Sequence, residues 1–295
     1  MKLLLTGCNG QLGFELQRSL APLAEVVAIG SAECDLSDET ALRSLIQTVK
    51  PDGIINPAAY TAVDKAETDT EQARKVNTDA PRVMGEEAGK LGAFVIHFST
   101  DYVFEGVGEQ FYKESDATNP QNVYGLTKRD GERALQQSCP QSLIMRTSWV
   151  VGAHGGNFAK TMLRLAAERE SLSVVADQYG APTSAALLAD VTAQLVGRIK
   201  QQGQQGFPFG LYHVVASGVT NWHAYAQFVI AEAIKAGNAM KVHPQTIKPI
   251  ATSDYPVPAK RPANSRLDTS LFQKTFNLQL PHWEHGVSHV LKQIL

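Results

Sequence analysis

A glycine-rich turn close to the N-terminus is the feature that most constrains the fold of this chain. The short apolar run 2–6 is followed by Gly7-Cys8-Asn9-Gly10-Gln11-Leu12-Gly13 and then by a helical pattern of apolar residues. Glycines between a strand and a helix permit a tight turn and let a pyrophosphate approach the N–H groups at the positive end of the helix. The GxxGxxG spacing therefore predicts a dinucleotide-binding loop, and a glycine-rich turn that binds nothing is the structural alternative.

Apolar runs and helical patterns alternate along the first half of the chain. After the first run, further strands are expected at 26–29, 53–56, 93–99 and 142–147. The segments between them predict helices at 38–49 with Ser37 as N-cap, at 71–91, and from about residue 124. A repeating order of strand and helix is typical of α/β proteins, and it predicts a Rossmann-like, doubly wound parallel sheet of six strands.

The pattern changes after residue 150, where a smaller second lobe is expected. We interpret residues 1–150 as an NAD(P)-binding Rossmann domain and residues 151–295 as a C-terminal α/β lobe that binds the substrate. Elements from about 184–220 are expected to return to the first sheet. The elements expected after residue 150 are helices at 158–169, 184–199, 222–236 and 287–295, strands at 172–175 and 211–216, and a proline-rich surface segment at 244–262.

Charge and hydropathy exclude several classes of partner. The 295 residues include 27 basic and 29 acidic side chains, which are interspersed and leave a formal charge of -2. Proteins that bind nucleic acid usually carry a basic patch or arm, so we expect a small-molecule partner and no nucleic acid. The apolar run 1–5 is too short for a signal peptide or a membrane span, so we expect no membrane partner and a cytoplasmic location.

The spacing of cysteines and histidines gives no support for a metal centre. Cys8, Cys34 and Cys139 lie far apart without a CxxC pair, which favours reduced thiols over a disulfide framework or a structural zinc site. His285 and His289 could share one helical face, but an amphipathic C-terminal helix explains them equally well. We assign no metal ligands, and Mg²⁺ is left open without support from any motif.

A tyrosine and a lysine four residues apart are the candidates for acid–base chemistry. In Asn122-Val123-Tyr124-Gly125-Leu126-Thr127-Lys128 the two side chains share one face of the predicted helix. A lysine ammonium beside a tyrosine hydroxyl stabilises the phenolate and lowers its pKa from about 10, which makes the tyrosine a usable acid or base near neutral pH. YxxxK alone is a weak motif, and a surface helix with a packed tyrosine and a solvated lysine is the alternative.

Hydroxyl groups and a carboxylate end one of the predicted strands. His97-Phe98-Ser99-Thr100-Asp101 places them at the carboxyl edge of the sheet, where ligands of open α/β sheets bind. Thr100 is therefore a candidate to hydrogen-bond a reacting oxygen, although such a hydroxyl can also serve the next turn. The three motifs occur in the order expected of one site, and together they favour catalysis.

The end of the second predicted strand bears on the choice of cofactor. An acidic residue there would hold the hydroxyls of the adenosine ribose and repel a 2′-phosphate. This chain has Gly30-Ser31 at that place, with Asp35 several residues later and no arginine close by. Both NADPH and NADH are compatible with this pattern, and NADPH is slightly favoured.

The glycine-rich turn, residues 99–104 and residues 124–128 together resemble the extended short-chain dehydrogenase/reductase superfamily. Within it, the chain is similar to the family of dTDP-4-dehydrorhamnose reductases, and the resemblance extends from end to end. Further matching stretches are residues 62–67, 146–149, 158–162, 177–183, 261–262 and 264–267.

This resemblance implies a set of binding and catalytic residues. The cofactor would be held by Gly7, Gly10, Gln11, Leu12, Gly13, Asp35, Leu36, Ala59, Tyr60, Thr61, Tyr124 and Lys128. The sugar nucleotide would contact Thr100, Asp101 and Trp149.

The reaction that the resemblance implies is NAD(P)H-dependent reduction of the C4 keto group of dTDP-4-dehydro-L-rhamnose. Tyr124 would donate the proton, with Lys128 and Thr100 assisting. The product, dTDP-L-rhamnose, would serve O-antigen or other cell-surface polysaccharide synthesis. A homodimer is compatible with the resemblance.

Three alternatives stay open on the same motifs. A nucleotide-sugar 4,6-dehydratase resembles this pattern but has a Thr-Asp-Glu run, where this chain has Tyr102 in the third position. A 4-epimerase would regenerate its cofactor in every turnover, whereas a reductase consumes it. The regulatory subunit of methionine adenosyltransferase resembles the same family and acts by docking to a partner.

Overall fold

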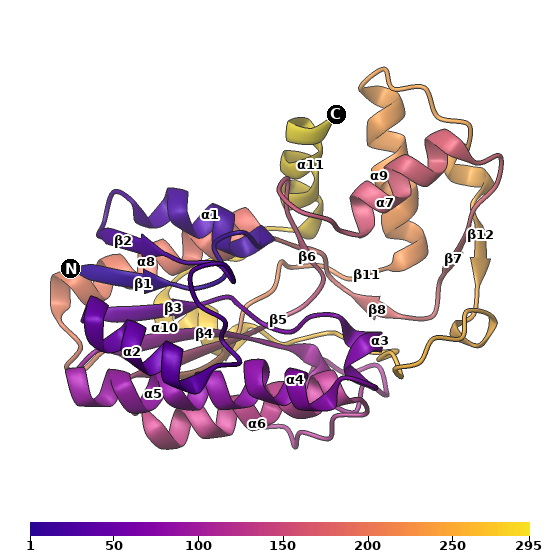
Figure 1. The fold of residues 1–295 in the computed structure, drawn as a ribbon. Coiled ribbons are helices and arrows are strands. Elements are labelled where there is room, and N and C mark those ends of the chain that lie inside the picture. The colour runs from indigo at the N-terminus through magenta and orange to yellow at the C-terminus, as the bar shows by residue number, and fades with distance from the viewer.

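A six-stranded parallel sheet forms the larger lobe of the molecule, which is described by a computed structural model of residues 1–295 (Figure 1). The strand order is β10-β5-β4-β3-β1-β2, and every pairing in the sheet is parallel. The strands are β1 (Lys2–Leu5), β2 (Glu25–Ala28), β3 (Gly53–Asn56), β4 (Phe94–Thr100), β5 (Ser142–Thr147) and β10 (Gly210–His213). The predicted doubly wound α/β fold is confirmed, and the strand order reverses between β1 and β3, where ligands of such sheets bind.

Helices cover both faces of this sheet, which explains why its strands are continuous apolar runs. Leu3 and Leu5 of β1 face one core, which α1, α8 and α10 close, while Leu4 faces the other core under α2, α5 and α6. Figure 1 shows α2, α5 and α6 together on one side of the sheet. These helices are α1 (Gln11–Leu20), α2 (Glu39–Val49), α5 (Ala80–Leu91), α6 (Val123–Ser138), α8 (Ala185–Gln202) and α10 (Ser270–Phe276).

The sixth strand does not come from the first half of the chain. Five strands precede residue 150, and β10 takes the edge position beside β5 from a segment more than sixty residues further on. We expected six strands before residue 150, although only five apolar runs occur there, and that count was wrong by one. α8 and β10 both lie within the segment 184–220, which was expected to return to this sheet. The error arose because the chain leaves the sheet after β5 to build part of the smaller lobe and then returns.

Two predicted helix starts also need correction. The N-cap of α2 is Asp38 and not Ser37, because the Asp38 carboxylate accepts hydrogen bonds from the N–H groups of Thr40 and Ala41, at 2.9 and 3.0 Å. The last helix, α11 (Trp283–Ile294), begins four residues earlier than expected.

The long helix predicted at 71–91 is interrupted by a wide turn. It consists of α4 (Thr70–Arg74), a π-helical segment Lys75–Asp79, and α5. Within that turn, the Asn77 side chain accepts a hydrogen bond from the N–H of Tyr60 at 2.8 Å and donates one to Thr127 Oγ1 at 3.2 Å. Wide turns of this kind often mark functional sites, and this one ties the segment after β3 to α6.

The smaller lobe packs three helices around a separate apolar core, on the upper right of Figure 1. Its helices are α7 (Phe158–Glu168), α9 (Trp222–Lys235) and α11. Of the strands in its three two-stranded ladders, only β7 was expected, at 172–175; the others were missed because strands this short leave little periodicity in a sequence. The ladders pair β6 (Val150–Val151) with β9 (Thr183–Ser184), β7 (Ser173–Val175) with β12 (Lys248–Ile250), and β8 (Tyr179–Gly180) with β11 (Thr220–Asn221).

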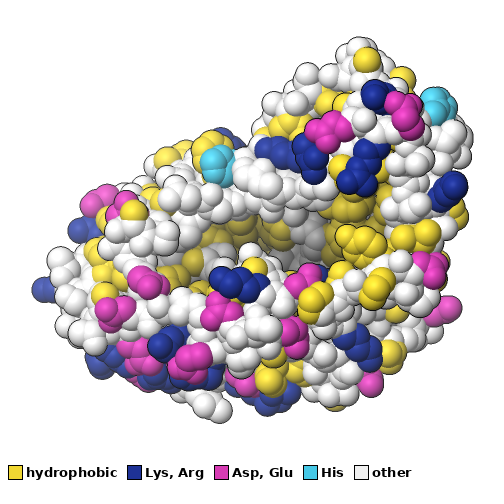
Figure 2. Space-filling model, turned by 45° about the vertical axis from the view of Figure 1, so that its right-hand side comes forward, with side chains coloured by type: hydrophobic (Ala, Val, Ile, Leu, Met, Phe, Trp, Pro, Cys, Tyr) yellow, Lys and Arg dark blue, Asp and Glu magenta, His cyan; other side chains and the backbone are white.

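The remaining short elements connect these parts. They are α3 (Val63–Ala66) and the 3₁₀ turns Asp101–Val103, Pro244–Thr246 and Thr252–Asp254. None of the helices combines the length and the apolar composition that crossing a bilayer requires. Figure 2 shows a hollow between the two lobes, with hydrophobic side chains on its inner walls.

Candidate active site

The glycine loop, residues 7–13, closes tightly over the end of β1. Gly7 has a φ of 56°, and a Cβ atom there would lie 2.9 Å from the Cβ of Ala58. A Cβ atom on Gly13 would lie only 2.0 Å from the carbonyl oxygen of Gly7, so neither position accepts a side chain. Gly10 is the N-cap of α1 and offers no side-chain cap, which leaves the first N–H groups of the helix to a ligand.

Side chains of the same loop join the two lobes. Gln11 Oε1 accepts hydrogen bonds from the N–H of Gly152 at 2.8 Å and from Asn157 Nδ2 at 3.0 Å. His154 lies 3.0 Å from the carbonyl oxygen of Asn9 through Nε2 and stacks on Phe14 with ring centroids 4.4 Å apart. Sequence reasoning assigned Gln11 to the cofactor only and missed this link, because its partners lie about 140 residues away.

Not every residue assigned to the cofactor directs its side chain toward the cleft. The Leu12 side chain is buried in the core between α1 and the sheet, so only its backbone is available to a ligand. Leu36 packs against the core on the opposite face. The Asp35 carboxylate accepts a hydrogen bond from the N–H of Ser37 at 2.9 Å, and this bond holds the pKa of Asp35 below its ordinary value.

The segment Ala59–Thr61 follows β3 and is held from two sides. Besides its backbone bond to Asn77, Tyr60 donates its hydroxyl to Asp69 Oδ2 at 2.9 Å. Asn77, which sequence reasoning missed, also donates to the Tyr60 carbonyl oxygen at 3.2 Å. The segment follows β3 at the point where the strand order reverses, and the preceding residue, Ala58, lies against Gly7 of the glycine loop.

Tyr124 stands in the first turn of α6. Asn122 caps this helix by accepting a hydrogen bond from the N–H of Gly125 at 2.8 Å. Burial raises the pKa of Tyr124 to about 12, opposed by hydrogen bonding with Thr100 and reinforced by the charge of Asp101. The expected lowering of this pKa by Lys128 was wrong, because burial of the phenol outweighs it. The phenol is therefore protonated at neutral pH.

Lys128 lies fully buried one helical turn further on. Its ammonium donates to the carbonyl oxygen of Phe98 at 2.7 Å and lies 3.1 Å from Nε2 of His97. Burial lowers the pKa of Lys128 to about 8, against the opposing charge of Glu132. The lysine side chain is thus held under the cleft and is not solvated at the surface, which rules out the surface-helix alternative.

A buried chain of polar groups continues below Lys128. His97 Nδ1 lies 3.0 Å from the Asn56 amide, which in turn accepts a hydrogen bond from Thr6 Oγ1 at 2.6 Å. Asn56 and His97 are register partners on β3 and β4. Burial and the Lys128 ammonium lower the pKa of His97 well below its ordinary value, so the imidazole is neutral. Sequence reasoning treated these three positions only as strand residues, although polar groups ending buried apolar strands were a visible signal.

Thr100 and Asp101 end β4 next to Tyr124. The Thr100 hydroxyl donates to Asp101 Oδ1 at 3.1 Å and accepts from the N–H of Tyr102 at 3.2 Å. Burial raises the pKa of Asp101 to about 6, and its second oxygen has no hydrogen-bond partner. Tyr102 packs edge-on against the Tyr124 ring and adds no carboxylate to the site.

Trp149 holds a strained position at the border between the lobes. Its φ is 49°, which is uncommon for a bulky residue and is typical of functional sites. The indole stacks on Trp222 at a centroid distance of 3.7 Å, and Trp222 donates to Gln178 at 3.1 Å. A Cβ atom on Gly180 would lie 2.9 Å from the Trp149 ring, so the stretch 177–183 supports the indole from below.

Arg261 is a cation that the predicted site residues did not include. Its Nη2 donates to Asp64 Oδ2 at 2.6 Å, while its Nη1 is buried without a partner. The charge of Arg261 acts on Tyr102, next to Thr100 and Asp101. The guanidinium therefore has an unpaired, buried nitrogen, and its charge reaches the residues that follow β4.

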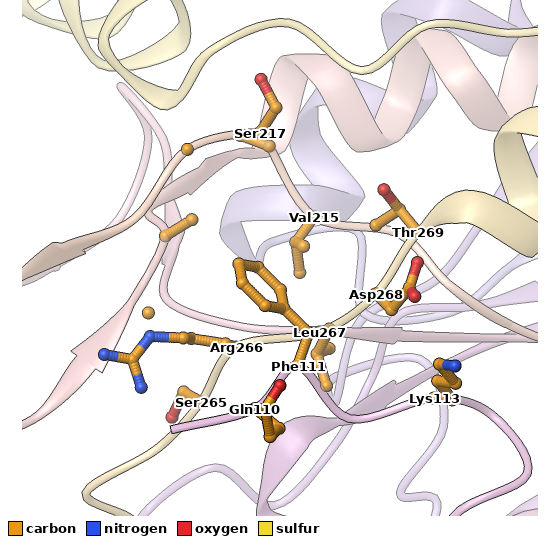
Figure 3. Close-up of a pocket in the computed structure, with 14 residues that line it drawn as sticks. Gln110, Phe111, Lys113, Val215, Ser217, Ser265, Arg266, Leu267, Asp268 and Thr269 are labelled. Atoms are coloured by element: carbon orange, nitrogen blue, oxygen red, sulfur yellow. The ribbon is translucent and has the colours of Figure 1, made fainter. Parts of the chain in front are cut away.

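One of the cavities in the structure lies outside the predicted site. It has a volume of about 430 Å³, and Figure 3 shows the Phe111 ring among the residues that line it. Gly180 lines it and also lies next to Trp149, but none of the residues predicted for cofactor or substrate lines it.

No group of three or more histidine, cysteine, aspartate or glutamate side chains is placed to hold a metal ion. His285 and His289 both lie on α11 without a third ligand.

Comparisons with known proteins match this chain along its whole length. The profile of the RmlD substrate binding domain family matches residues 1–295. The dTDP-4-dehydrorhamnose reductase of Salmonella typhimurium is 49% identical over 298 aligned residues, which cover 100% of this chain and 98% of that protein. Two solved dTDP-4-dehydrorhamnose reductases each superpose with a TM-score of 0.90 over 99% of both chains. The one from Clostridium acetobutylicum is 34% identical, and the one from Bacillus anthracis, solved in complex with NADP, is 33% identical.

Proposed function

This chain belongs to the RmlD substrate binding domain family, and on that premise we propose that it reduces dTDP-4-dehydro-L-rhamnose to dTDP-L-rhamnose with NADPH or NADH. The observation that carries the proposal is the meeting of Thr100 and Tyr124 at the carboxyl edge of the sheet, with Lys128 buried one helical turn further along α6. Residues 1–150 hold the cofactor in this proposal, and residues 151–295 form most of the substrate lobe.

The glycine loop fits a dinucleotide. The missing side chains of Gly7 and Gly13 keep the loop close to β1, and the uncapped start of α1 faces the place of the pyrophosphate. Gln11 and Leu12 contribute backbone N–H groups, and Ala59–Thr61 line the cofactor at the strand reversal. When bound, the reduced nicotinamide supplies the hydride that C4 of the sugar receives.

Tyr124 acts as the proton donor. Its pKa of about 12 keeps the phenol protonated at neutral pH, so it can transfer a proton to the oxygen on C4 as that oxygen becomes an alkoxide. The carbonyl then becomes a hydroxyl, and the phenolate that remains is stabilised by the Lys128 ammonium. His97 and the Phe98 carbonyl oxygen hold that ammonium in place.

Thr100 assists the same oxygen. Its hydroxyl donates to Asp101 in the absence of substrate and turns toward the ketone oxygen when the sugar binds. A preorganised donor at a developing oxyanion contributes about 3 kcal/mol to catalysis. Asp101, mostly ionised at neutral pH, keeps the Thr100 side chain beside the site.

The small lobe and its border bind the rest of the substrate. Trp149 presents an indole face that suits the apolar edge of a 6-deoxysugar. Arg261, with its free Nη1, is placed to take part of the negative charge of the diphosphate.

A matched pair of tyrosine variants tests this proposal. The purified protein is incubated with reduced cofactor and dTDP-4-dehydro-L-rhamnose, and cofactor oxidation and product are followed together. We expect Tyr124→Phe to lose at least about 100-fold in kcat, since it removes the general acid. Tyr225→Phe is the control, because the Tyr225 hydroxyl is buried in the smaller lobe without a partner. Equal activity of Tyr124→Phe and the wild type would exclude the proposed role, and a wild type that turns over no cofactor would favour an epimerase or a docking function.

A further inference from the structure

The turn after β2 brings the Glu33 carboxylate to the end of the strand, where the residue in the chain itself is Gly30. In dinucleotide-binding folds an acidic side chain near the end of the second strand binds the hydroxyls of the adenosine ribose. Gly30 holds that place here, and it is buried. A Cβ atom on Gly30 would lie 2.5 Å from Asn9 Nδ2 and 3.3 Å from Glu33 Oε2, so two polar side chains already occupy the space of the missing one.

Glu33 reaches this place by folding back over the turn. Its Oε2 accepts a hydrogen bond from the N–H of Gly30 at 2.7 Å, and the N–H of Cys34 closes the turn on the Gly30 carbonyl oxygen at 3.2 Å. The glycine loop is tied to the same point, because the N–H of Cys8 donates to the carbonyl oxygen of Ile29 at 3.0 Å. The Glu33 carboxylate therefore lies beside the loop that we assign to the pyrophosphate.

No nearby lysine or arginine side chain is free to form an ion pair with the Glu33 carboxylate. Asp35 and Asp38 stand in the same turn, and no lysine or arginine occurs between Arg18 and Arg43, both of which are in ion pairs with other carboxylates. Lys75 lies close enough to lower the pKa of Asp35 and is itself 3.9 Å from a glutamate. The adenosine end of the site thus carries a negative field that opposes an added phosphate.

We propose that Glu33 is the residue that selects the cofactor, by accepting hydrogen bonds from the adenosine ribose hydroxyls and repelling a 2′-phosphate. The proposal rests on the dinucleotide site of the proposed function and narrows it: this chain binds NADH more tightly than NADPH. It reverses the slight preference for NADPH that the sequence favoured, because that preference assumed that no carboxylate reached the end of β2.

Binding measurements without any sugar test this assignment separately from catalysis. Dissociation constants for NADH and NADPH are measured by cofactor fluorescence on the full chain, for the wild type, Glu33→Gln and Glu170→Gln. We expect the wild type to bind NADPH about tenfold more weakly than NADH. Glu33→Gln should weaken NADH and tighten NADPH, so that the ratio of the two constants shifts by roughly tenfold. Glu170→Gln removes an exposed carboxylate from the smaller lobe and should leave the ratio unchanged.

The possible results of these measurements distinguish the Glu33 assignment from the proposed function. A wild type that binds NADPH as tightly as NADH, or a ratio that is the same in wild type and Glu33→Gln, would overturn the assignment. Binding of neither cofactor would overturn it together with the proposed function. If both cofactors bind with the predicted ratio but no keto-sugar is reduced, the Glu33 assignment stands and the proposed reaction falls.

Discussion

At the scale of single residues, the site depends on groups that the strand register brings together. The Tyr124 and Lys128 pair was visible in the sequence because four residues make one helical turn. The polar groups that lie beneath Lys128 were not visible in the sequence. His97 and Asn56 are 41 positions apart and meet only because β3 and β4 pair in one particular register. Sequence reasoning could therefore name the proposed reacting residues but not the residues that hold Lys128 in place.

The pKa of Lys128 makes a prediction about pH. Burial lowers this pKa to about 8, so the ammonium is present below that pH and is lost as the pH rises through it. Tyr124, with a pKa of about 12, remains protonated throughout this range. Since the ammonium stabilises the phenolate left by proton transfer, we expect kcat for keto-sugar reduction to be level near neutral pH and to fall above about pH 8.

A pH–rate profile at saturating substrate and cofactor checks this prediction. Lys128→Arg provides the comparison, because a guanidinium keeps its charge across the whole range. Its activity should be low, since the planar group does not fit between His97 and the Phe98 carbonyl oxygen, but it should lack the fall above pH 8. A wild-type profile that is flat to pH 10 would show that the charge on Lys128 does not limit the reaction.

At the scale of elements, the sequence predicted best where burial is uniform. The first five strands of the large sheet were predictable to within one residue, because helices cover both faces of the sheet and these strands are apolar runs. β10 ends three residues before its expected bound. The wide turn at Lys75–Asp79 was not predictable, because it depends on hydrogen bonds from Asn77 to Tyr60 and Thr127 rather than on a local pattern. The short helix α10 was missed for a related reason: seven residues give too little periodicity.

Two helical glycines test the close packing of α6 on the wide turn. A Cβ atom on Gly131 would lie 2.0 Å from the Asn77 carbonyl oxygen, and neither backbone can move without disturbing the site. We expect Gly131→Ala to lower the free energy of unfolding by about 3 kcal/mol. Gly89→Ala, on α5, is the control: its nearest neighbour would be 3.4 Å away, so alanine should be neutral or stabilise the helix by up to about 1 kcal/mol.

Urea denaturation followed by circular dichroism measures both variants. We also expect Gly131→Ala to weaken cofactor binding, because Asn77 holds the Tyr60 backbone beside the cofactor site. Equal stability of the two alanine variants would show that α6 and the wide turn are not in tight contact.

At the scale of the whole molecule, the two lobes are joined through the glycine loop itself. Gln11, Asn9 and Phe14 contact residues 152–157, which lead directly from Trp149 into the small lobe. The glycine loop therefore contacts the segment that connects Trp149 to the small lobe. The order of elements was readable from the sequence, but this junction was not, because it depends on contacts between side chains far apart in the chain.

The place of β10 at the edge of the sheet and the place of Glu33 near the end of β2 likewise depend on the tertiary fold. β10 joins β5 only after the chain has passed through the small lobe. Glu33 reaches the end of β2 only because the turn folds back on Gly30. In both cases the residues are visible in the sequence, but their positions follow from the folded structure and not from a local sequence pattern.

Transfer of a labelled hydride tests the central claim most directly. The protein is supplied with dTDP-4-dehydro-L-rhamnose and reduced cofactor that carries deuterium at C4 of the nicotinamide, in each of its two positions in turn. The account predicts one deuterium at C4 of the rhamnosyl product for one of the two labels, with one cofactor oxidised for each product formed. Turnover of the sugar with no deuterium in the product and no net oxidation of cofactor would contradict it, because the hydride would then have come from the sugar itself.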